Sequence, residues 1–154
     1  MKTKLISLIL IAAGCFSFTL SNLTSSSTEK EVFEKKDKGI TFFEGNWEEA
    51  LEKAKEEDKL IFLDAYASWC GPCKLMAKNT FTDQKIGDYF NAHFINFKMD
   101  MEKDPQGPRL SKKLALSAYP SLFFIDKNES VVHSGIGYLQ AEQLMELGQQ
   151  AENK

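Results

Sequence analysis

Two cysteines separated by two residues carry the chemistry that this 154-residue sequence can do. They lie in the segment Trp69-Cys70-Gly71-Pro72-Cys73-Lys74, shortly after an apolar run at 60–63. Two thiols at this spacing, at the junction of a strand and a helix, can close a small disulfide and open it again. The pattern therefore predicts a dithiol redox centre made of Cys70 and Cys73.

The position of each cysteine in the predicted helix gives it a different role. A helix that begins near Cys70 has unpaired backbone N–H groups at its N-terminus, and these stabilise a thiolate. We therefore expect Cys70 to be the attacking, partly exposed thiol. Cys73, one turn inside, should be more buried and should resolve the mixed disulfide. Gly71 and Pro72 place no cationic side chain between the thiols, which favours a reductant.

A zinc half-site is the main alternative for this pair of cysteines. Zinc needs four ligands, which usually come as two such pairs. His93 and His133 are the histidines of the chain, and neither has the spacing of a partner ligand. We therefore expect no metal and no cofactor at Cys70 and Cys73.

The cysteines must be positioned by a strand and a helix, and the sequence alternates between the two. Residues 60–66 are nearly all apolar, which is typical of a strand covered on both faces. Pro72 suits the first turn of a helix over 70–79, and Asn46 followed by Glu49 predicts a capped helix before the strand. The other predicted elements are an edge strand at 40–43, a helix from 82–83 to about 91, a strand at 94–99, a helix at 109–116, a hairpin of 121–125 with 131–134, and a closing helix at 140–150. This order predicts an α/β fold with a central mixed β-sheet and helices on both faces.

Asp64 is a carboxylate inside the apolar strand, six residues before Cys70. An acid among apolar neighbours should have a raised pKa and can exchange protons near neutral pH. The alternative is an aspartate at the end of the strand that faces water. The apolar residues around Asp64 argue against that alternative.

From about Phe42 to Gln150 the sequence resembles thioredoxin, most strongly through the motif at 69–74. The resemblance implies the thioredoxin fold. It also implies a role for Asp64, which matches the family's buried carboxylate. In thioredoxins this group assists proton transfer at the inner cysteine, here Cys73.

The resemblance further implies a client-binding groove beside the cysteines. Pro120 matches the family's cis-proline, and a cis peptide bond costs little only before proline; a proline at a strand start is the plain alternative. The backbone of Tyr119 is then free to pair with an extended client, and Gly137 matches a family glycine near the groove. The residues expected to contact the client are Trp69, Gly71, Pro72, Tyr119, Pro120 and Gly137.

The sequence departs from thioredoxin at several positions. Tyr66 stands where thioredoxin has a second tryptophan, and the family's core lysine has no clear counterpart, with Asn96 and Lys98 nearest. Residues 80–83 and the helix after them are more similar to the periplasmic C-terminal domain of the transmembrane thiol:disulfide interchange reductase. The sequence thus also resembles secreted bacterial thioredoxin-like proteins.

The N-terminal residues have the pattern of a secretory signal peptide. Lys2 and Lys4 precede an apolar stretch at 5–20, which is short for a membrane span. We assign residues 1–21 to the signal peptide, 22–39 to a flexible tether and 40–154 to a thioredoxin-like domain.

Cys15 leaves two interpretations of this leader open. Ala12-Ala13-Gly14-Cys15 resembles a bacterial lipobox, in which Cys15 would carry a lipid anchor. Apolar residues continue beyond it, which fits instead a chance cysteine in a discarded leader. A retained N-terminal anchor is the second choice.

These patterns predict a thiol-disulfide oxidoreductase in the periplasm or otherwise outside the cytoplasm. We expect it to reduce protein disulfides through Cys70 and Cys73, with electrons from a membrane donor. The alternatives are a disulfide oxidase or isomerase that uses the same residues, and a non-catalytic binding or chaperone module. The net charge is −3 and no basic face stands out, so we do not expect nucleic acid as a partner.

Overall fold

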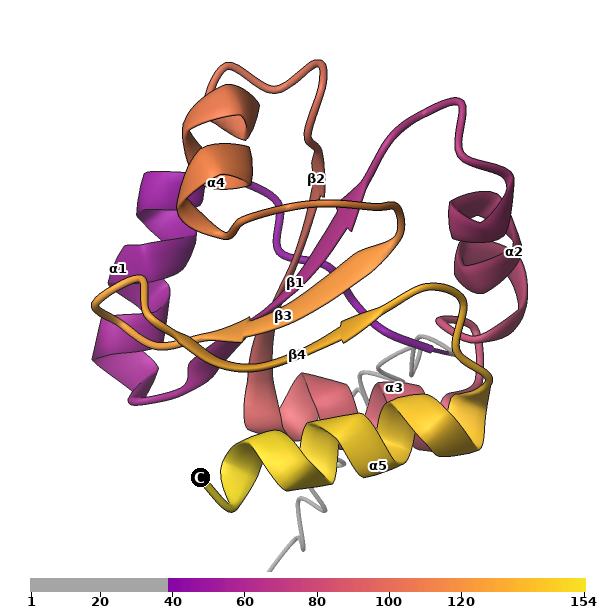
Figure 1. Ribbon diagram of the computed structural model, residues 1–154. Helices are drawn as coiled ribbons and strands as arrows, with labels where there is room; N and C mark the ends of the chain where they lie inside the picture. Colours follow the sequence, from indigo (N-terminus) through magenta and orange to yellow (C-terminus); the bar gives the residue numbers. More distant parts are fainter. Residues whose placement is uncertain (1–38) are drawn as a thin grey trace, which may run out of the picture. The chain divides into compact units, whose positions relative to one another are not determined.

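A four-stranded mixed sheet forms the centre of the computed structural model, which describes residues 39–154. The strands lie in the order β2-β1-β3-β4, with β1 parallel to β2 and antiparallel to β3, and β3 antiparallel to β4 (Figure 1). Their bounds are β1 Leu60–Tyr66, β2 Phe94–Asp100, β3 Ser121–Ile125 and β4 Val131–Ile136. The predicted signal peptide, the lipobox and nearly all of the tether lie outside the described residues.

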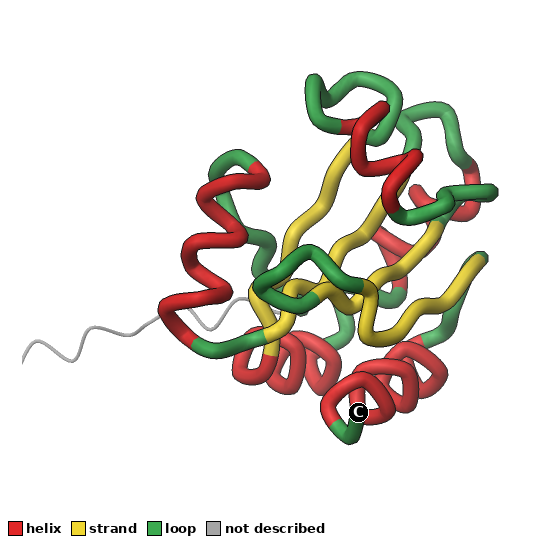
Figure 2. The backbone as a smooth tube through the Cα atoms, turned by 60° about the vertical axis from the view of Figure 1, so that its left-hand side comes forward, coloured by secondary structure: helices red, strands yellow, loops and turns green. Residues whose placement is uncertain are grey.

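Five helices cover the two faces of this sheet in the described part of the chain. They are α1 Trp47–Glu57, α2 Gly71–Asn79, α3 Gln84–His93, α4 Gly107–Lys113 and α5 Ala141–Glu152. Helices α1 and α4 lie on one face, and α2, α3 and α5 lie on the other (Figures 1 and 2). The predicted α/β architecture, with helices on both faces, is confirmed. Within residues 39–154, no helix is long and apolar enough to cross a membrane.

Strand β1 shows how the sequence divides the core into two layers. Successive side chains of a strand point to opposite faces. Leu63 therefore packs on the side of α1 and α4, and Phe62 packs on the side of α2, α3 and α5, against Phe90 and Phe124. Asp64 lies two residues after Phe62 in the strand, so its side chain points to the same face of the sheet, toward the layer that contains α2.

The starts of α1 and α3 follow capping residues that the sequence offers. Asn46 and Glu49 form a capping box at the start of α1, each side chain accepting a hydrogen bond from the other's backbone N–H. Asp83 accepts hydrogen bonds from two backbone N–H groups at the start of α3. These contacts satisfy N–H groups that would otherwise lack partners, so the predicted starts agree closely with the structure.

The predicted edge strand at 40–43 is wrong, because this segment forms no strand. It runs beside β2 and makes one backbone hydrogen bond with it, from Phe43 N–H to the Asn96 carbonyl at 2.7 Å. The Asn96 side chain, rather than its backbone, donates to the Thr41 carbonyl at 3.3 Å. This side-chain bond replaces the second backbone hydrogen bond that a strand paired with β2 would make. Gly39, with a left-handed φ of 99°, is buried at the start of the segment.

Helix α4 begins earlier and ends earlier than the predicted range of 109–116. Gly107 starts the helix against the Met101 carbonyl, where a Cβ would come within 2.2 Å of the oxygen. The helix ends at Lys113 because Ala115 adopts a left-handed φ of 50°. The Leu116 N–H then turns back to the Ser111 carbonyl at 2.9 Å. Glycine and proline in this segment therefore begin the helix rather than precede it.

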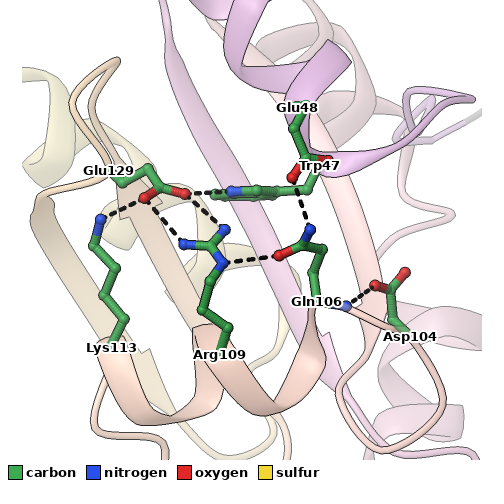
Figure 3. Close-up of polar contacts among 7 residues, drawn as sticks. All are labelled: Trp47, Glu48, Asp104, Gln106, Arg109, Lys113 and Glu129. Atoms are coloured by element: carbon green, nitrogen blue, oxygen red, sulfur yellow. Dashed lines mark hydrogen bonds and ion pairs between the residues drawn. The ribbon is translucent and has the colours of Figure 1, made fainter.

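A polar cluster around Glu129 joins α1, α4 and the turn between β3 and β4 (Figure 3). The Glu129 carboxylate accepts hydrogen bonds from Trp47 Nε1 at 2.6 Å, from two nitrogens of Arg109 at 3.0 and 3.2 Å, and from Lys113. These donors, Arg109 foremost, lower the pKa of Glu129 to about 2. The cluster fixes the far end of the sheet, since the β3–β4 turn lies beyond Ile125, which pairs with Ile61 at the start of β1.

Candidate active site

A disulfide joins Cys70 and Cys73 at the start of α2. The two sulfurs are 2.11 Å apart and the Cα atoms are 5.3 Å apart. Cys70 is the N-cap of the helix, and its Sγ accepts a hydrogen bond from the Cys73 N–H at 3.1 Å. Pro72 lies in the first turn, where its missing N–H leaves no helical bond unmade. The strand, the turn and the helix thus place both sulfurs at the helix N-terminus, as predicted.

The expectation that Cys70 is partly exposed is wrong for this disulfide-bonded form. Cys70 is 2% exposed and Cys73 is 5% exposed, so both are buried and their predicted order is reversed. Ala67 is buried with the two cysteines, and Tyr66 and Tyr119 pack against the group. The inward N-cap bond of Cys70 and this aromatic packing together cover its sulfur.

Asp64 is buried near the cysteines, as the apolar strand predicts. It is 6% exposed, and its Oδ1 atom has no hydrogen-bond partner. Burial raises the pKa of Asp64 to about 7, and the positive charge of Lys98 opposes this shift in part. A carboxyl group with such a pKa can take up and release a proton near neutral pH.

Asp64 and Cys73 line the same pocket, which has a volume of about 400 Å³. Lys98 and Tyr66 also line it. Of the two positions considered for the family's core lysine, Lys98 lies opposite Asp64 in the register of β1 and β2, whereas Asn96 lies opposite Phe62. The pocket therefore brings an acid, a cation and the inner cysteine together under α2.

Pro120 and Gly137 lie together at the start of β3 and the end of β4. The peptide bond between Tyr119 and Pro120 is cis, and Gly137 has a left-handed φ of 90°. The Gly137 N–H donates to the Pro120 carbonyl at 2.8 Å. Since Tyr119 packs against the cysteines, this pair of loops lies beside the disulfide. Ile136 and Tyr138, on either side of Gly137, are exposed apolar residues.

Trp69 projects into solvent next to the disulfide, with 66% of its surface exposed. Its ring meets Tyr119 edge to face at a centroid distance of 5.8 Å. Its Nε1 donates to Glu102 at 2.8 Å, and the neighbouring Ser68 N–H donates to Asp100 at 3.2 Å. The loop before Cys70 is thus held by two carboxylates, Asp100 at the end of β2 and Glu102 just after it.

The two histidines lie away from this site. His93 contacts Glu152 at 2.6 Å, and His133 contacts Gln150 at 3.1 Å. In the part of the chain that the structure describes, no group of three histidine, cysteine or acidic side chains could hold a metal ion.

A family model named Thioredox_DsbH, with the description "Protein of unknown function, DUF255", matches residues 24–148, most of the chain. The chain belongs to this thioredoxin-like family.

Curated relatives of this thioredoxin-like chain include two kinds of protein. Thioredoxin H4 of Arabidopsis thaliana is 36% identical over 85 residues, which are 55% of this chain and 66% of that protein. Thiol:disulfide interchange protein DsbD of Actinobacillus pleuropneumoniae serotype 5b is 32% identical over 92 residues, which are 58% of this chain and 16% of DsbD. The chain therefore spans just under two thirds of the first relative and a small part of the second.

Two solved structures match most of the described domain. A protein from Bacteroides thetaiotaomicron, named as a candidate disulphide-isomerase, is 43% identical with a TM-score of 0.66, over 76% of this chain and 97% of that one. The oxidised C-terminal domain of Neisseria meningitidis DsbD is 25% identical with a TM-score of 0.59, over 72% of this chain and 99% of that one. The thioredoxin fold and the resemblance to the DsbD C-terminal domain are confirmed.

Asp100 and Glu102 are the site residues of this thioredoxin-like chain that the sequence did not single out. A usable signal existed, because β1 and β2 are parallel and their carboxyl ends lie at the same edge of the sheet. Residues at the end of β2 and just after it, such as Asp100 and Glu102, must then lie near those just after β1, which include Ser68 and Trp69. Recognising the parallel pair would have pointed to this acidic segment.

Proposed function

We propose that this protein is a thiol-disulfide oxidoreductase that acts on other proteins through Cys70 and Cys73. The observation that carries the proposal is the disulfide at the N-terminus of α2, which shares a pocket with the buried Asp64. No other cysteine occurs in residues 39–154. This part of the chain therefore has no second disulfide that could stabilise the fold, and we assign Cys70 and Cys73 to thiol-disulfide exchange.

The geometry supports a two-step exchange. In the reduced protein, the Cys70 thiolate, stabilised by the N–H groups of α2, attacks a client disulfide. One client sulfur leaves as a thiolate and takes up a proton, and Cys70 holds the other in a mixed disulfide. Cys73 then gives its proton to Asp64 and attacks the Cys70 sulfur. The internal disulfide forms, the second client sulfur leaves and is protonated, and the client has gained two electrons.

The client is proposed to lie across the apolar surface around the disulfide. Trp69, Gly71 and Pro72 form one side of this surface, and Tyr119, Pro120 and Gly137 form the other. Exposed aromatic and apolar side chains can cover an extended polypeptide, and the backbone of Tyr119 can pair with it.

We infer that the protein works as a reductant outside the cytoplasm. No positive side chain lies between the cysteines, so the thiolate has less stabilisation than in strong oxidants. In an oxidising compartment Cys70 and Cys73 would remain oxidised and unable to reduce a client, so the protein needs an electron donor in the membrane. The similarity to the DsbD C-terminal domain supports this placement, and Cys15 is the residue that a lipid anchor would use.

A disulfide isomerase is the second candidate function. The observation in its favour is the 43% identity to the Bacteroides thetaiotaomicron protein named as a candidate disulphide-isomerase. An isomerase needs the same attack by Cys70 but releases the client before Cys73 resolves the mixed disulfide. The two functions differ in whether the client ends with fewer disulfides or with rearranged ones.

Reduction of insulin by the purified domain with dithiothreitol tests the proposal. We expect rapid reduction by the wild type and none above background by Cys70→Ser. Equilibration with glutathione should give a potential nearer about −270 mV than about −120 mV. A potential near the second value would overturn the reductant role. Faster recovery of scrambled ribonuclease than reduction of insulin would favour the isomerase.

A further inference from the structure

The pocket beside the cysteines has one wall that the proposed exchange does not use. Residues Ile40 and Phe42, from the segment that precedes α1, line it together with Asp64, Cys73 and Lys98. This segment runs beside β2 without becoming a strand (Figure 1). Its side chains therefore take part in the environment of the groups that would move protons.

Lys98 is the charged group opposite Asp64, yet the two form no hydrogen bond through Asp64 Oδ1. The residues face each other in the parallel register of β1 and β2, while Oδ1 is buried without a partner. The Lys98 ammonium lies over the Phe42 ring instead, with Nζ 5.3 Å from the ring centroid. This distance is within the range of a cation–π contact.

Phe42 is held in place from both sides. Its ring meets Phe81 edge to face at a centroid distance of 5.4 Å. The Ile40 N–H donates to the Phe81 carbonyl at 2.7 Å, and the Phe43 N–H donates to the Asn96 carbonyl at 2.7 Å. The ring is therefore a fixed platform for the lysine.

We propose that Phe42 is a positioning residue for proton transfer at Cys73, because its ring holds the Lys98 ammonium away from Asp64. The inference rests on the proposed function of Cys70 and Cys73 and deepens it. In this role Phe42 acts through Lys98 and not on either sulfur directly.

The consequence concerns the strength of Asp64 as a base. Asp64 must accept the proton of the Cys73 thiol as the Cys73 sulfur attacks the Cys70 sulfur of the mixed disulfide. A general base works best when its pKa is near the ambient pH. A direct ion pair with Lys98 would stabilise the carboxylate and weaken this base. Tyr66 is the other titratable group that lines the pocket with Asp64 in the oxidised protein, and Cys73 lines it as part of the disulfide. Strand β3 contributes the apolar Leu122 at this level.

The test is a carboxyl titration of Asp64 by carbon NMR in the oxidised protein, without a client. We expect Phe42→Leu to move the midpoint of Asp64 to lower pH by about half a unit or more, because Lys98 is released toward the carboxylate. Phe42→Tyr keeps the ring and should leave the midpoint unchanged. In the Lys98→Met background, Phe42→Leu should have no further effect.

Two outcomes would overturn the inference. One is an unchanged midpoint in Phe42→Leu. The other is an equal shift by Phe42→Leu with and without Lys98, which would mean that the ring acts by excluding water. Should Phe42→Leu fail to fold, Lys98→Met alone decides: a rise of the Asp64 midpoint by more than about one unit would show that Lys98 already pairs with Asp64.

Kinetic measurements, read together with the titration, distinguish failure of this inference from failure of the proposed function. The pH at which resolution of a mixed disulfide between Cys70 and a peptide reaches half of its maximal rate should fall in Phe42→Leu, together with the titration midpoint, and should rise again in the double variant with Lys98→Met. Failure of the wild type to reduce insulin would refute the proposed function alone, since the titration needs no client. An unmoved titration in a protein that reduces insulin would refute this inference alone.

Discussion

At the scale of single residues, the charge state of Asp64 links stability to chemistry. Its position in an apolar strand is enough to predict burial and a raised pKa from the sequence, and both are found. The position of Lys98 was not predictable, because it depends on the register of β1 and β2, two strands far apart in the chain. The burial of Cys70 was missed because Tyr119, which covers it, comes from a distant loop.

Asp64→Asn should change the pH dependence of stability in a defined direction. The folded protein keeps a proton on Asp64 that the unfolded chain loses between about pH 4 and pH 7. The free energy of unfolding from this residue therefore falls as the pH rises through that window, by up to about 4 kcal/mol. Urea unfolding of the oxidised proteins should show Asp64→Asn and wild type alike near pH 4 and the variant more stable above pH 7. Equal stability at both ends of the window would contradict the raised pKa.

At the scale of elements, the starts of α1 and α3 were predictable because their capping residues are local in sequence. Asn46 and Asp83 carry that signal. The segment 40–43 was not, since its alternation suits a strand and only the side-chain bond of Asn96 shows why the ladder stops. The Glu129 cluster was equally hidden, because its donors come from α1 and α4, two elements that the turn meets only in the folded chain (Figure 3).

Glu129→Gln should destabilise the fold without changing the redox centre. Glu129 loses its charge-assisted bonds to Arg109 and Lys113, which should cost about 1–3 kcal/mol at neutral pH. The contribution of Glu129 is complete above the pKa of an unfolded glutamate and is lost as the pH falls toward about 2. Urea unfolding at neutral and acid pH measures this.

The matched control is Lys127→Met, in the same turn. Its ion pair with Asp58 is exposed, at 52% and 85% of the two side chains, so its loss should change stability by less than about 0.5 kcal/mol. A Glu129→Gln variant as stable as this control would contradict a stabilising role for the Glu129 cluster. The potential of the cysteine pair should be the same in both variants.

At the scale of the whole molecule, the thioredoxin fold followed from the order of elements and from the motif at 69–74, and the family match and the structure confirm it. The groove beside Pro120 depends on loops from β3 and β4 that meet only in three dimensions. For that reason the sequence could name its residues only through the resemblance to thioredoxin.

The oxidised protein should be more stable than the reduced protein. A disulfide that is hard to reduce is one that the folded state stabilises, whereas strong oxidants stabilise their reduced form. Urea unfolding with and without dithiothreitol should therefore give a higher midpoint for the oxidised form. A higher midpoint for the reduced form would instead indicate an oxidase.

The most direct measurement of the central claim is the trapping of a client disulfide. Cys73→Ser keeps the attacking sulfur and removes the resolving one, so reaction with insulin should accumulate a mixed disulfide through Cys70, identified by peptide mass spectrometry. Cys70→Ser should accumulate little. Trapping through Cys73 in the Cys70→Ser protein, with none in Cys73→Ser, would reverse the order of attack, and no trapping in either variant would contradict exchange with protein clients.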